Sequence, residues 1–179
     1  MANVANFNTN NPHIANDSAA NAVVIGLFHM TIRTANLFAS LEFYKSILGL
    51  KEIHRPDFGF PGAWLACPTP CGAPIIHLYA GGPALGSGGT VPAGSAAIDH
   101  VCLACSGFHA FRSRFKTACK SWREFLVPGT TPWQLFIYDP SGVQFELTFE
   151  GTAESGVPVD MSPERCYVPG ASFFEAPTP

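Results

Sequence analysis

The sequence predicts an α+β fold built from two βαβββ modules, and three observations support this prediction. A series of strand-forming and helix-forming segments over residues 25–82 returns in the same order over residues 96–150. In each half, short segments with alternating apolar and polar residues accompany one segment of helical periodicity. Residues 83–95, between the halves, are dominated by Gly, Pro and Ala, which is typical of an irregular connector.

Composition narrows the class of protein. The chain has 179 residues, of which 47% are hydrophobic and 13% charged, so it is long enough to bury a core. A net charge of −3 with ten Lys and Arg argues against a nucleic-acid partner, and no apolar run reaches the roughly 20 residues that span a membrane. The first residues lack the pattern of a secretory signal, and six cysteines then indicate reduced thiols. We therefore expect a cytoplasmic protein.

The first half follows a tail. Residues 1–22 are rich in Asn and Ala without an apolar period, which predicts disorder, and the folded domain is expected over residues 23–150. A strand over 25–34 places His29 opposite its apolar neighbours. A helix over 35–48 should end at Gly49, and strands follow at 51–55, 63–67 and 74–80, the last of which carries His77.

The second half repeats this order. A strand over 97–104 carries His100, and Ser106 is placed to cap the following helix. Strands are predicted at 122–127, 133–138 and 143–149, and an Asp-Pro-Ser-Gly turn at 139–142 precedes the last of them. Residues 151–179 form a C-terminal extension whose Tyr167, Phe173 and Phe174 suit anchoring on the domain or on a second subunit, with a free tail as the alternative.

Four side chains with metal-binding chemistry occupy equivalent positions in the two halves. His29 and His100 lie in the first strands, 71 residues apart, and His77 and Glu146 lie in the fourth strands, 69 residues apart. A carboxylate such as Glu146, opposite an apolar strand face, needs water or positive charge. Three imidazoles and a carboxylate suit a first-row divalent ion, so the sequence predicts a metal site at these four residues.

Several segments, taken in order, resemble the vicinal oxygen chelate superfamily, which includes glyoxalase I, extradiol dioxygenases, fosfomycin resistance enzymes and bleomycin-binding proteins. The similarity covers about residues 25–150 and rests on residues 28–30 (FHM), 41–50 (LEFYKSILGL), 62–65 (GAWL), 76–78 (IHL), 99–101 (DHV), 134–136 (QLF) and 139–142 (DPSG).

The resemblance implies a mixed sheet that curls around a metal site, and it places His29, His77, His100 and Glu146 on the family's four ligand positions. It implies one divalent ion, either Fe, Ni, Co, Mn or Zn, a small-molecule substrate bound through two neighbouring oxygens, and a homodimer. Whether the modules pair within one chain or across two chains stays open.

Coordination chemistry favours a glyoxalase-like lyase or isomerase. An octahedral ion with four protein ligands keeps two positions, which suffice for a bidentate substrate but not for dioxygen as well. Phe136 also stands where the extradiol signature has tyrosine. A ring-cleaving Fe(II) dioxygenase remains the first alternative, since His77 can instead leave the ion and act as the acid-base group. A non-catalytic drug-binding protein is the second.

Other residues are expected to share the face of the ligands. His77 and Glu146 are assigned catalytic as well as metal-binding roles, although glyoxalase I usually has Glu or Gln at the position of His77. An arginine can pair with an anionic substrate group, and amide, aromatic and phenol side chains can line the concave face of the sheet around the metal site. The predicted substrate-binding residues are Arg33, Trp64, Gln134, Phe136 and Tyr138.

Overall fold

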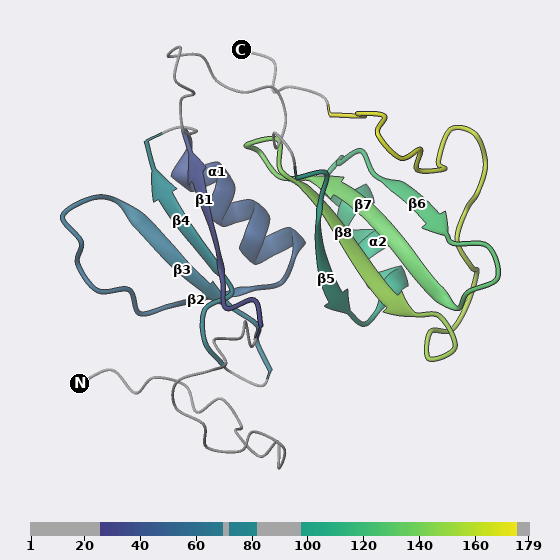
Figure 1. Cartoon of the computed structure of the whole chain (residues 1–179), viewed down its shortest axis with the longest axis horizontal. Helices are drawn as coiled ribbons and strands as arrows, with labels where there is room; N and C mark the ends of the chain where they lie inside the picture. The colour runs from purple at the N-terminus through teal and green to yellow at the C-terminus, as the bar shows by residue number, and fades with distance from the viewer. Residues whose placement is uncertain (1–25, 70–71, 82–97, 175–179) are drawn as a thin grey trace, which may run out of the picture.

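Both halves of the chain have the same order of elements in the computed structural model, which describes residues 26–69, 72–81 and 98–174. The first module contains β1 (Met30–Thr34), α1 (Leu37–Glu42), a π-helical turn η1 (Phe43–Ile47), β2 (Lys51–Ile53), β3 (Gly62–Ala66) and β4 (Ile76–Ala80). The second contains β5 (Val101–Cys105), α2 (Phe108–Thr117), β6 (Arg123–Leu126), β7 (Pro132–Tyr138) and β8 (Gln144–Glu150). The predicted α+β fold is confirmed (Figure 1).

Each module forms its own four-stranded sheet. The first sheet has the order β1-β4-β3-β2 and the second has the order β5-β8-β7-β6. In each sheet the first strand of the module pairs with the fourth in parallel, and the other neighbours are antiparallel. The predicted tail at residues 1–22 and connector at 83–95 lie outside the described residues.

Several predicted boundaries were wrong by a few residues. β1 begins at Met30 and β5 at Val101, whereas strands from residues 25 and 97 were expected. The ladders begin where β4 and β8 supply partners, at the pairs of Met30 with Ile76 and Val101 with Phe145. His29 and His100 therefore each lie one residue before a strand, so their positions still correspond.

The first helix becomes a π-helical turn in its second half, whereas the sequence predicted one continuous α-helix. Instead of one helix over 35–48, α1 continues into η1, where Leu48 N donates to Phe43 O and Leu50 N donates to Tyr44 O. This turn buries Phe43, Tyr44 and Ile47 together. Gly49 ends the segment as predicted, with a φ of +76° that a residue bearing a Cβ adopts at a steric cost.

The cap of α2 comes from far along the chain. Ser106 was predicted to cap this helix, but the N-cap residue is Gly107 and it makes no side-chain cap hydrogen bond. The carboxylate of Glu154 accepts hydrogen bonds from Gly107 N (2.8 Å) and Phe108 N (3.0 Å) instead. A negative charge at this position also suits the helix dipole.

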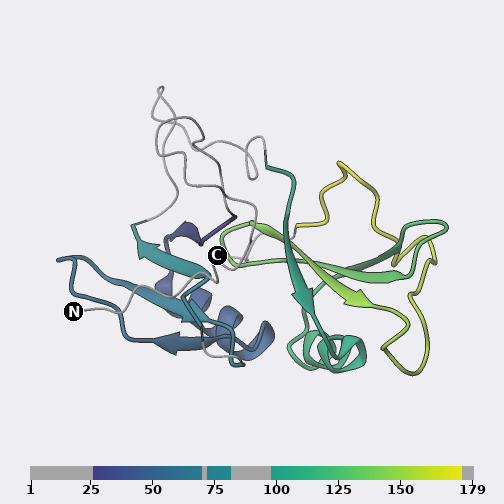
Figure 2. The same cartoon turned by 60° about the horizontal axis from the view of Figure 1, so that its bottom comes forward.

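The two modules share one hydrophobic core, and their helices lie side by side (Figure 2). Tyr44 is fully buried between the modules, where its hydroxyl donates to Asp139 Oδ2 at 2.7 Å. The other oxygen of Asp139 accepts from Ser141 N and Val143 N, as the turn chemistry of residues 139–142 predicted. Burial raises the pKa of Asp139, and the hydrogen bond from Tyr44 opposes that shift.

The C-terminal extension is anchored on the second module. Arg165 O and Tyr167 N each hydrogen-bond the backbone of Glu124 at 2.8 Å, so residues 165–167 run beside β6. The Tyr167 ring stacks on Phe136 with 3.7 Å between centroids and 6° between planes. Of the alternatives left open by the sequence, anchoring on the domain is the one observed.

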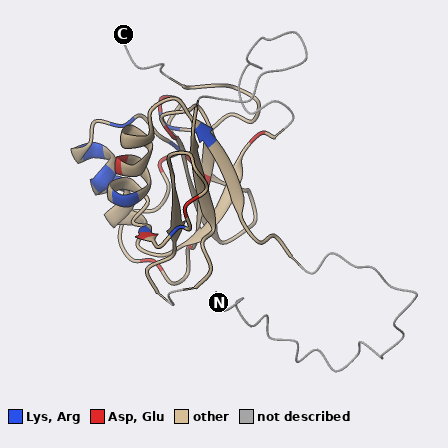
Figure 3. Cartoon of the chain, turned by 90° about the vertical axis from the view of Figure 1, so that its left-hand side faces the viewer, with Lys and Arg blue, Asp and Glu red and all other residues tan. Residues whose placement is uncertain are grey.

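Basic residues lie on the helices and also on strands (Figure 3), and three of them, Arg112, Arg114 and Lys116, share α2. On α2, Arg112 forms an ion pair with the buried Glu124 and donates to Val157 O and Pro158 O of the extension. This helix therefore helps to hold the extension in place. No helix in the described part of the chain has the length and apolarity to cross a bilayer.

Candidate metal centre

The second sheet has one face toward its helix and the core and an outer face that carries His100 and Glu146. His100 Nδ1 lies 2.7 Å from Asp99 Oδ1, and His100 Nε2 lies 3.0 Å from Glu146 Oε2. The hydrogen bond to His100 lowers the pKa of Asp99, so this carboxyl is an anion near neutral pH and accepts the Nδ1 proton. The Nε2 lone pair then faces a carboxylate oxygen, and two acceptors this close need a proton or a metal cation between them.

The other oxygen of Glu146 accepts hydrogen bonds from three neighbouring side chains. Glu146 Oε1 accepts from Gln134 Nε2 at 2.7 Å, from Cys102 Sγ at 3.2 Å and from the Thr148 hydroxyl. The side chain is only 10% exposed, so these contacts fix its rotamer. One oxygen is therefore held by neutral donors while the other, Oε2, is presented toward His100.

The first sheet carries the other pair of predicted ligands, on its own outer face. The rings of His29 and His77 stack with 3.9 Å between centroids, and the Trp64 ring stacks on the opposite side of His77 at 4.5 Å. His29 Nδ1 and His77 Nε2 are buried and have no hydrogen-bond partner among the described residues. Buried nitrogens without partners are costly, and a cation is one group that satisfies them.

The environment of His77 favours the neutral imidazole. Burial, the neighbouring His29 and the positive charge of Arg55 lower the pKa of His77 to about 4. Near neutral pH its nitrogen lone pair is therefore available either to a metal ion or to a substrate proton.

The four predicted ligands form two separate pairs. Within residues 26–69, 72–81 and 98–174, no group of three or more His, Cys, Asp or Glu side chains is arranged to hold a metal ion. The reason is geometric: α1 lies between the first sheet and the second module (Figure 1), so the outer face of that sheet points away from the second sheet. We call the pairs His29–His77 and His100–Glu146 the first and second half-sites. The donor types of these half-sites, imidazole nitrogen and carboxylate oxygen, are ones that divalent ions bind in proteins.

The predicted substrate-binding residues are distributed over both outer faces. Trp64 stacks on His77, and Arg33 Nη2 lies 3.5 Å from Gly81 O at an exposed strand end. On β7, Gln134 holds Glu146, whereas Phe136 is 2% exposed because Tyr167 covers it. The structure thus gives Gln134 and Phe136 contacts within the protein.

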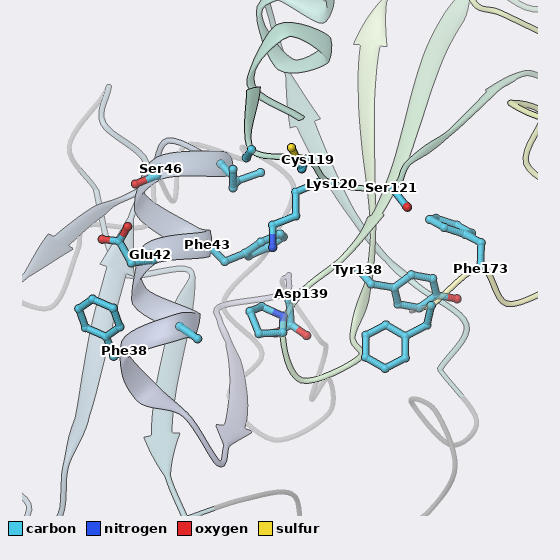
Figure 4. Close-up of a pocket in the computed structure, with 15 residues that line it drawn as sticks. Phe38, Glu42, Phe43, Ser46, Cys119, Lys120, Ser121, Tyr138, Asp139 and Phe173 are labelled. Carbon is cyan, nitrogen blue, oxygen red and sulfur yellow. The ribbon is translucent and has the colours of Figure 1, made fainter. Parts of the chain in front are cut away.

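Tyr138 borders a different hollow, a cavity of about 570 Å³ between the two modules (Figure 4). Its lining residues come from α1 and η1 on one side, from residues 118–121 after α2, and from β7, the turn after it and the extension on the other side. They include Phe38, Glu42, Phe43, Ser46, Lys120, Asp139 and Phe173. Of the described residues that border the cavity, Tyr138 alone was predicted as a site residue.

Sequence reasoning missed the group that supports His100. The Tyr167 hydroxyl donates to Asp99 Oδ1 at 3.0 Å, and Gln144 Nε2 lies 3.2 Å from the same hydroxyl. Asp99 directly precedes His100 in the sequence, so its proximity was visible there. Tyr167 lies 68 residues from Asp99, and no local pattern indicates that contact.

Solved structures of similar fold support the same two-module architecture. A mutant fosfomycin resistance protein FosX from Listeria monocytogenes, in complex with Mn(II) and 1S,2S-dihydroxypropylphosphonic acid, has a TM-score of 0.51 and 17% identity over 70% of this chain and 92% of its own. Lactoylglutathione lyase from Agrobacterium tumefaciens has a TM-score of 0.51 and 14% identity over 75% and 100%. A glyoxylase/bleomycin resistance protein/dioxygenase domain from Frankia sp. EAN1pec has a TM-score of 0.55 and 19% identity over 74% and 96%.

The paired βαβββ modules and these neighbours define a glyoxalase-type fold. No curated protein matches the chain in sequence. The family model for the Glyoxalase/Bleomycin resistance protein/Dioxygenase superfamily matches residues 26–147, and the chain belongs to that superfamily.

Proposed function

We propose that the chain is a metal-dependent enzyme that binds a small substrate through two neighbouring oxygens and acts as a glyoxalase-type lyase or isomerase. The observation that carries this proposal is the close approach of His100 Nε2 to Glu146 Oε2, 3.0 Å apart. His29 and His77 repeat that pairing at the equivalent positions of the first module. A repeat that preserves four ligand-type side chains is difficult to explain by packing alone.

We further propose that two copies of the chain complete each metal site. In one chain the half-sites are on separate outer faces, and the first half-site has buried imidazole nitrogens without partners among the described residues. A symmetric dimer that brings the first half-site of one copy to the second half-site of the other creates two equivalent four-ligand sites. This explains both the pairing of the ligands and their separation.

When bound, a divalent ion would stabilise negative charge that develops on a chelated substrate oxygen. The residues of the chain perform the remaining tasks. Asp99 and Tyr167 orient His100, while Gln134, Cys102 and Thr148 hold one oxygen of Glu146. The neutral imidazole of His77 either completes the ligand set or accepts a substrate proton.

The solved structures support a divalent cofactor in this fold. The FosX complex contains Mn(II) together with a ligand that bears two neighbouring hydroxyl groups. The lactoylglutathione lyase belongs to the reaction class proposed here. At under 20% identity these proteins support the class of chemistry and leave the substrate of this chain to experiment.

A second candidate is the ring-cleaving dioxygenase, because the stacking of His77 between His29 and Trp64 does not itself place its nitrogen on the ion. If His77 stays off the ion, three ligands leave room for a bidentate catecholate and dioxygen.

Metal analysis and oxygen uptake test both candidates. We expect purified protein to contain about one divalent ion per chain, because each site of the proposed dimer would use one half-site from each copy. After anaerobic loading with Fe(II), a panel of catechols should cause no rapid oxygen uptake. Rapid uptake would establish the dioxygenase, and protein without metal that still binds small molecules in chelator would instead indicate a binding protein.

Replacing Tyr167 with phenylalanine is expected to weaken metal binding about tenfold without unfolding the protein, since losing a group that orients a metal ligand typically costs 10–100-fold. The Tyr167→Phe variant keeps the ring stack on Phe136 but loses the hydrogen bond to Asp99, so His100 is less firmly oriented. Competition with a chelating indicator measures the affinity, and a thermal melt checks the fold. Tyr138→Phe is the matched control, because that hydroxyl donates to Ser172 at 3.4 Å and not to Asp99. Equal metal affinities for both variants would contradict the proposed positioning role.

A further inference from the structure

A loop of the first module folds an arginine onto the outer face of the first sheet. In the loop between β2 and β3, the guanidinium of Arg55 lies over the rings of both Phe58 and Phe60, with its carbon 4.7 Å from each ring centroid. It also approaches Gly62 so closely that a Cβ added to this glycine would lie 3.3 Å from the guanidinium carbon. The Phe58 ring lies 6.0 Å from the Trp64 ring, which stacks on His77 at 4.5 Å, so Arg55 lies beside the first half-site.

Most of the hydrogen-bonding capacity of Arg55 is unused. Nη1 donates to Phe60 O at 3.2 Å, whereas Nε and Nη2 are buried and have no partner among the described residues. An unpaired buried donor is energetically costly, and more so on a charged group. The fork of Nε and Nη2 is also the edge of a guanidinium that binds a carboxylate or phosphonate through two parallel hydrogen bonds.

Neighbouring side chains on this face also have buried nitrogens without hydrogen-bond partners among the described residues. His29 Nδ1, His77 Nε2 and Trp64 Nε1 are likewise buried without partners among the described residues. The rings from Phe58 through Trp64 and His77 to His29 form a continuous row, with centroid separations of 6.0, 4.5 and 3.9 Å. The face therefore combines an apolar aromatic wall with unsatisfied donors and a positive charge, which is suited to an organic anion.

We propose that Arg55 binds the carboxylate or phosphonate group of a small organic anion whose apolar part packs on the aromatic row. Phe58 and Phe60, the two rings against the guanidinium, are 49% and 39% exposed, so a ligand can reach them from solvent. The proposal deepens the proposed function and rests on it for one point, the identification of this anion as the substrate. The substrate class is then an anion that also bears two neighbouring oxygens for the metal ion.

Calorimetric titration tests this site with phenylphosphonate and phenylacetate as anionic probes and 2-phenylethanol as the neutral probe. The wild-type protein should bind at least one anion in both its metal-loaded and its chelator-treated forms, and should bind the neutral probe more weakly. Arg55→Met should weaken anion binding about tenfold or more, and Arg55→Lys should recover only part of the loss because an ammonium lacks the planar fork. The preferred probe distinguishes a phosphonate from a carboxylate site.

Two other arginines serve as comparisons. Arg123 also lies over a phenylalanine, with its guanidinium carbon 4.7 Å from the Phe173 centroid in the second module, so Arg123→Met is the matched control and should leave anion binding unchanged. Arg33 is the rival anion site indicated by the sequence. If Arg33→Met abolishes binding and Arg55→Met does not, or if wild type binds neither anion, the proposal is wrong.

Failure of the anion site and failure of the metal-dependent function give different results. Anion binding that depends on Arg55 in protein that takes up no metal would support this site and reject the metal-dependent function. If the protein takes up metal normally but the Arg55→Met variant binds the anions as wild type does, the metal-dependent function is supported and the anion site is rejected. A thermal melt of Arg55→Met confirms that the variant is folded, and the Arg55→Lys result provides a second measurement if that variant is unstable.

Discussion

Replacing Glu146 with alanine should remove nearly all bound metal from the purified protein. Glu146 supplies the only carboxylate of the proposed ligand set, and its Oε2 already faces His100 Nε2 at 3.0 Å. Without this charge the three imidazoles hold a divalent ion far less tightly, and we expect a loss of affinity of about 100-fold or more. Elemental analysis after dialysis at fixed ionic strength measures the occupancy.

A neighbouring carboxylate on the same strand provides the control for this substitution. Glu150 is exposed at the end of β8, where it accepts hydrogen bonds from Thr152. Glu150→Ala changes the net charge by the same amount and should keep the metal content of wild type. Wild-type occupancy in the Glu146→Ala variant would place the ion elsewhere and remove the basis of the proposed function.

Mixing two inactive variants should restore metal binding if the sites form between chains. His29→Ala damages the first half-site and Glu146→Ala damages the second. In a heterodimer of these variants, one site receives both damaged halves, and the other receives both intact halves. Differently tagged chains, expressed together and purified through both tags, should therefore contain about half the wild-type metal per chain, although each homodimer contains almost none.

A second mixture distinguishes reassembly of a site from general stabilisation. His29→Ala and His77→Ala both damage the first half-site, so their heterodimer has no intact pair of halves and should contain no more metal than either parent. Restoration in both mixtures would have to arise from something other than complementary half-sites. If neither mixture recovers metal, the modules pair within one chain, and α1 must then move from its position between them.

Most of the fold was predictable because the patterns that specify it are local. Alternation placed His77 and Glu146 on the strand faces opposite the core, and Gly49 ended the first helix at the predicted residue. The ends of β1 and β5 were not predictable in this way, because a strand stops where its partner stops. The partners' limits depend on register, which periodicity within one segment does not encode.

The contacts that organise the site come from residues far apart in sequence. Glu154 caps α2 from 46 residues away, and Tyr167 reaches Asp99 across 68. The guanidinium of Arg55 is placed by a turn-rich segment whose path no hydrophobic period describes. The candidate ligands were therefore visible in the sequence, whereas their arrangement as two separate pairs and the groups that orient them were not.

The C-terminal extension covers part of the second module, and no equivalent segment covers the first module among the described residues. The two modules therefore differ in how far their outer faces are open to solvent. The stacking of Tyr167 on Phe136 leaves the central strand of the second module closed to solvent at that point. The equivalent region of the first module is bordered by the exposed rings of Phe58 and Phe60. In the proposed enzyme, substitutions that change which compounds are accepted should therefore concentrate around Phe58 and Phe60 of the first module.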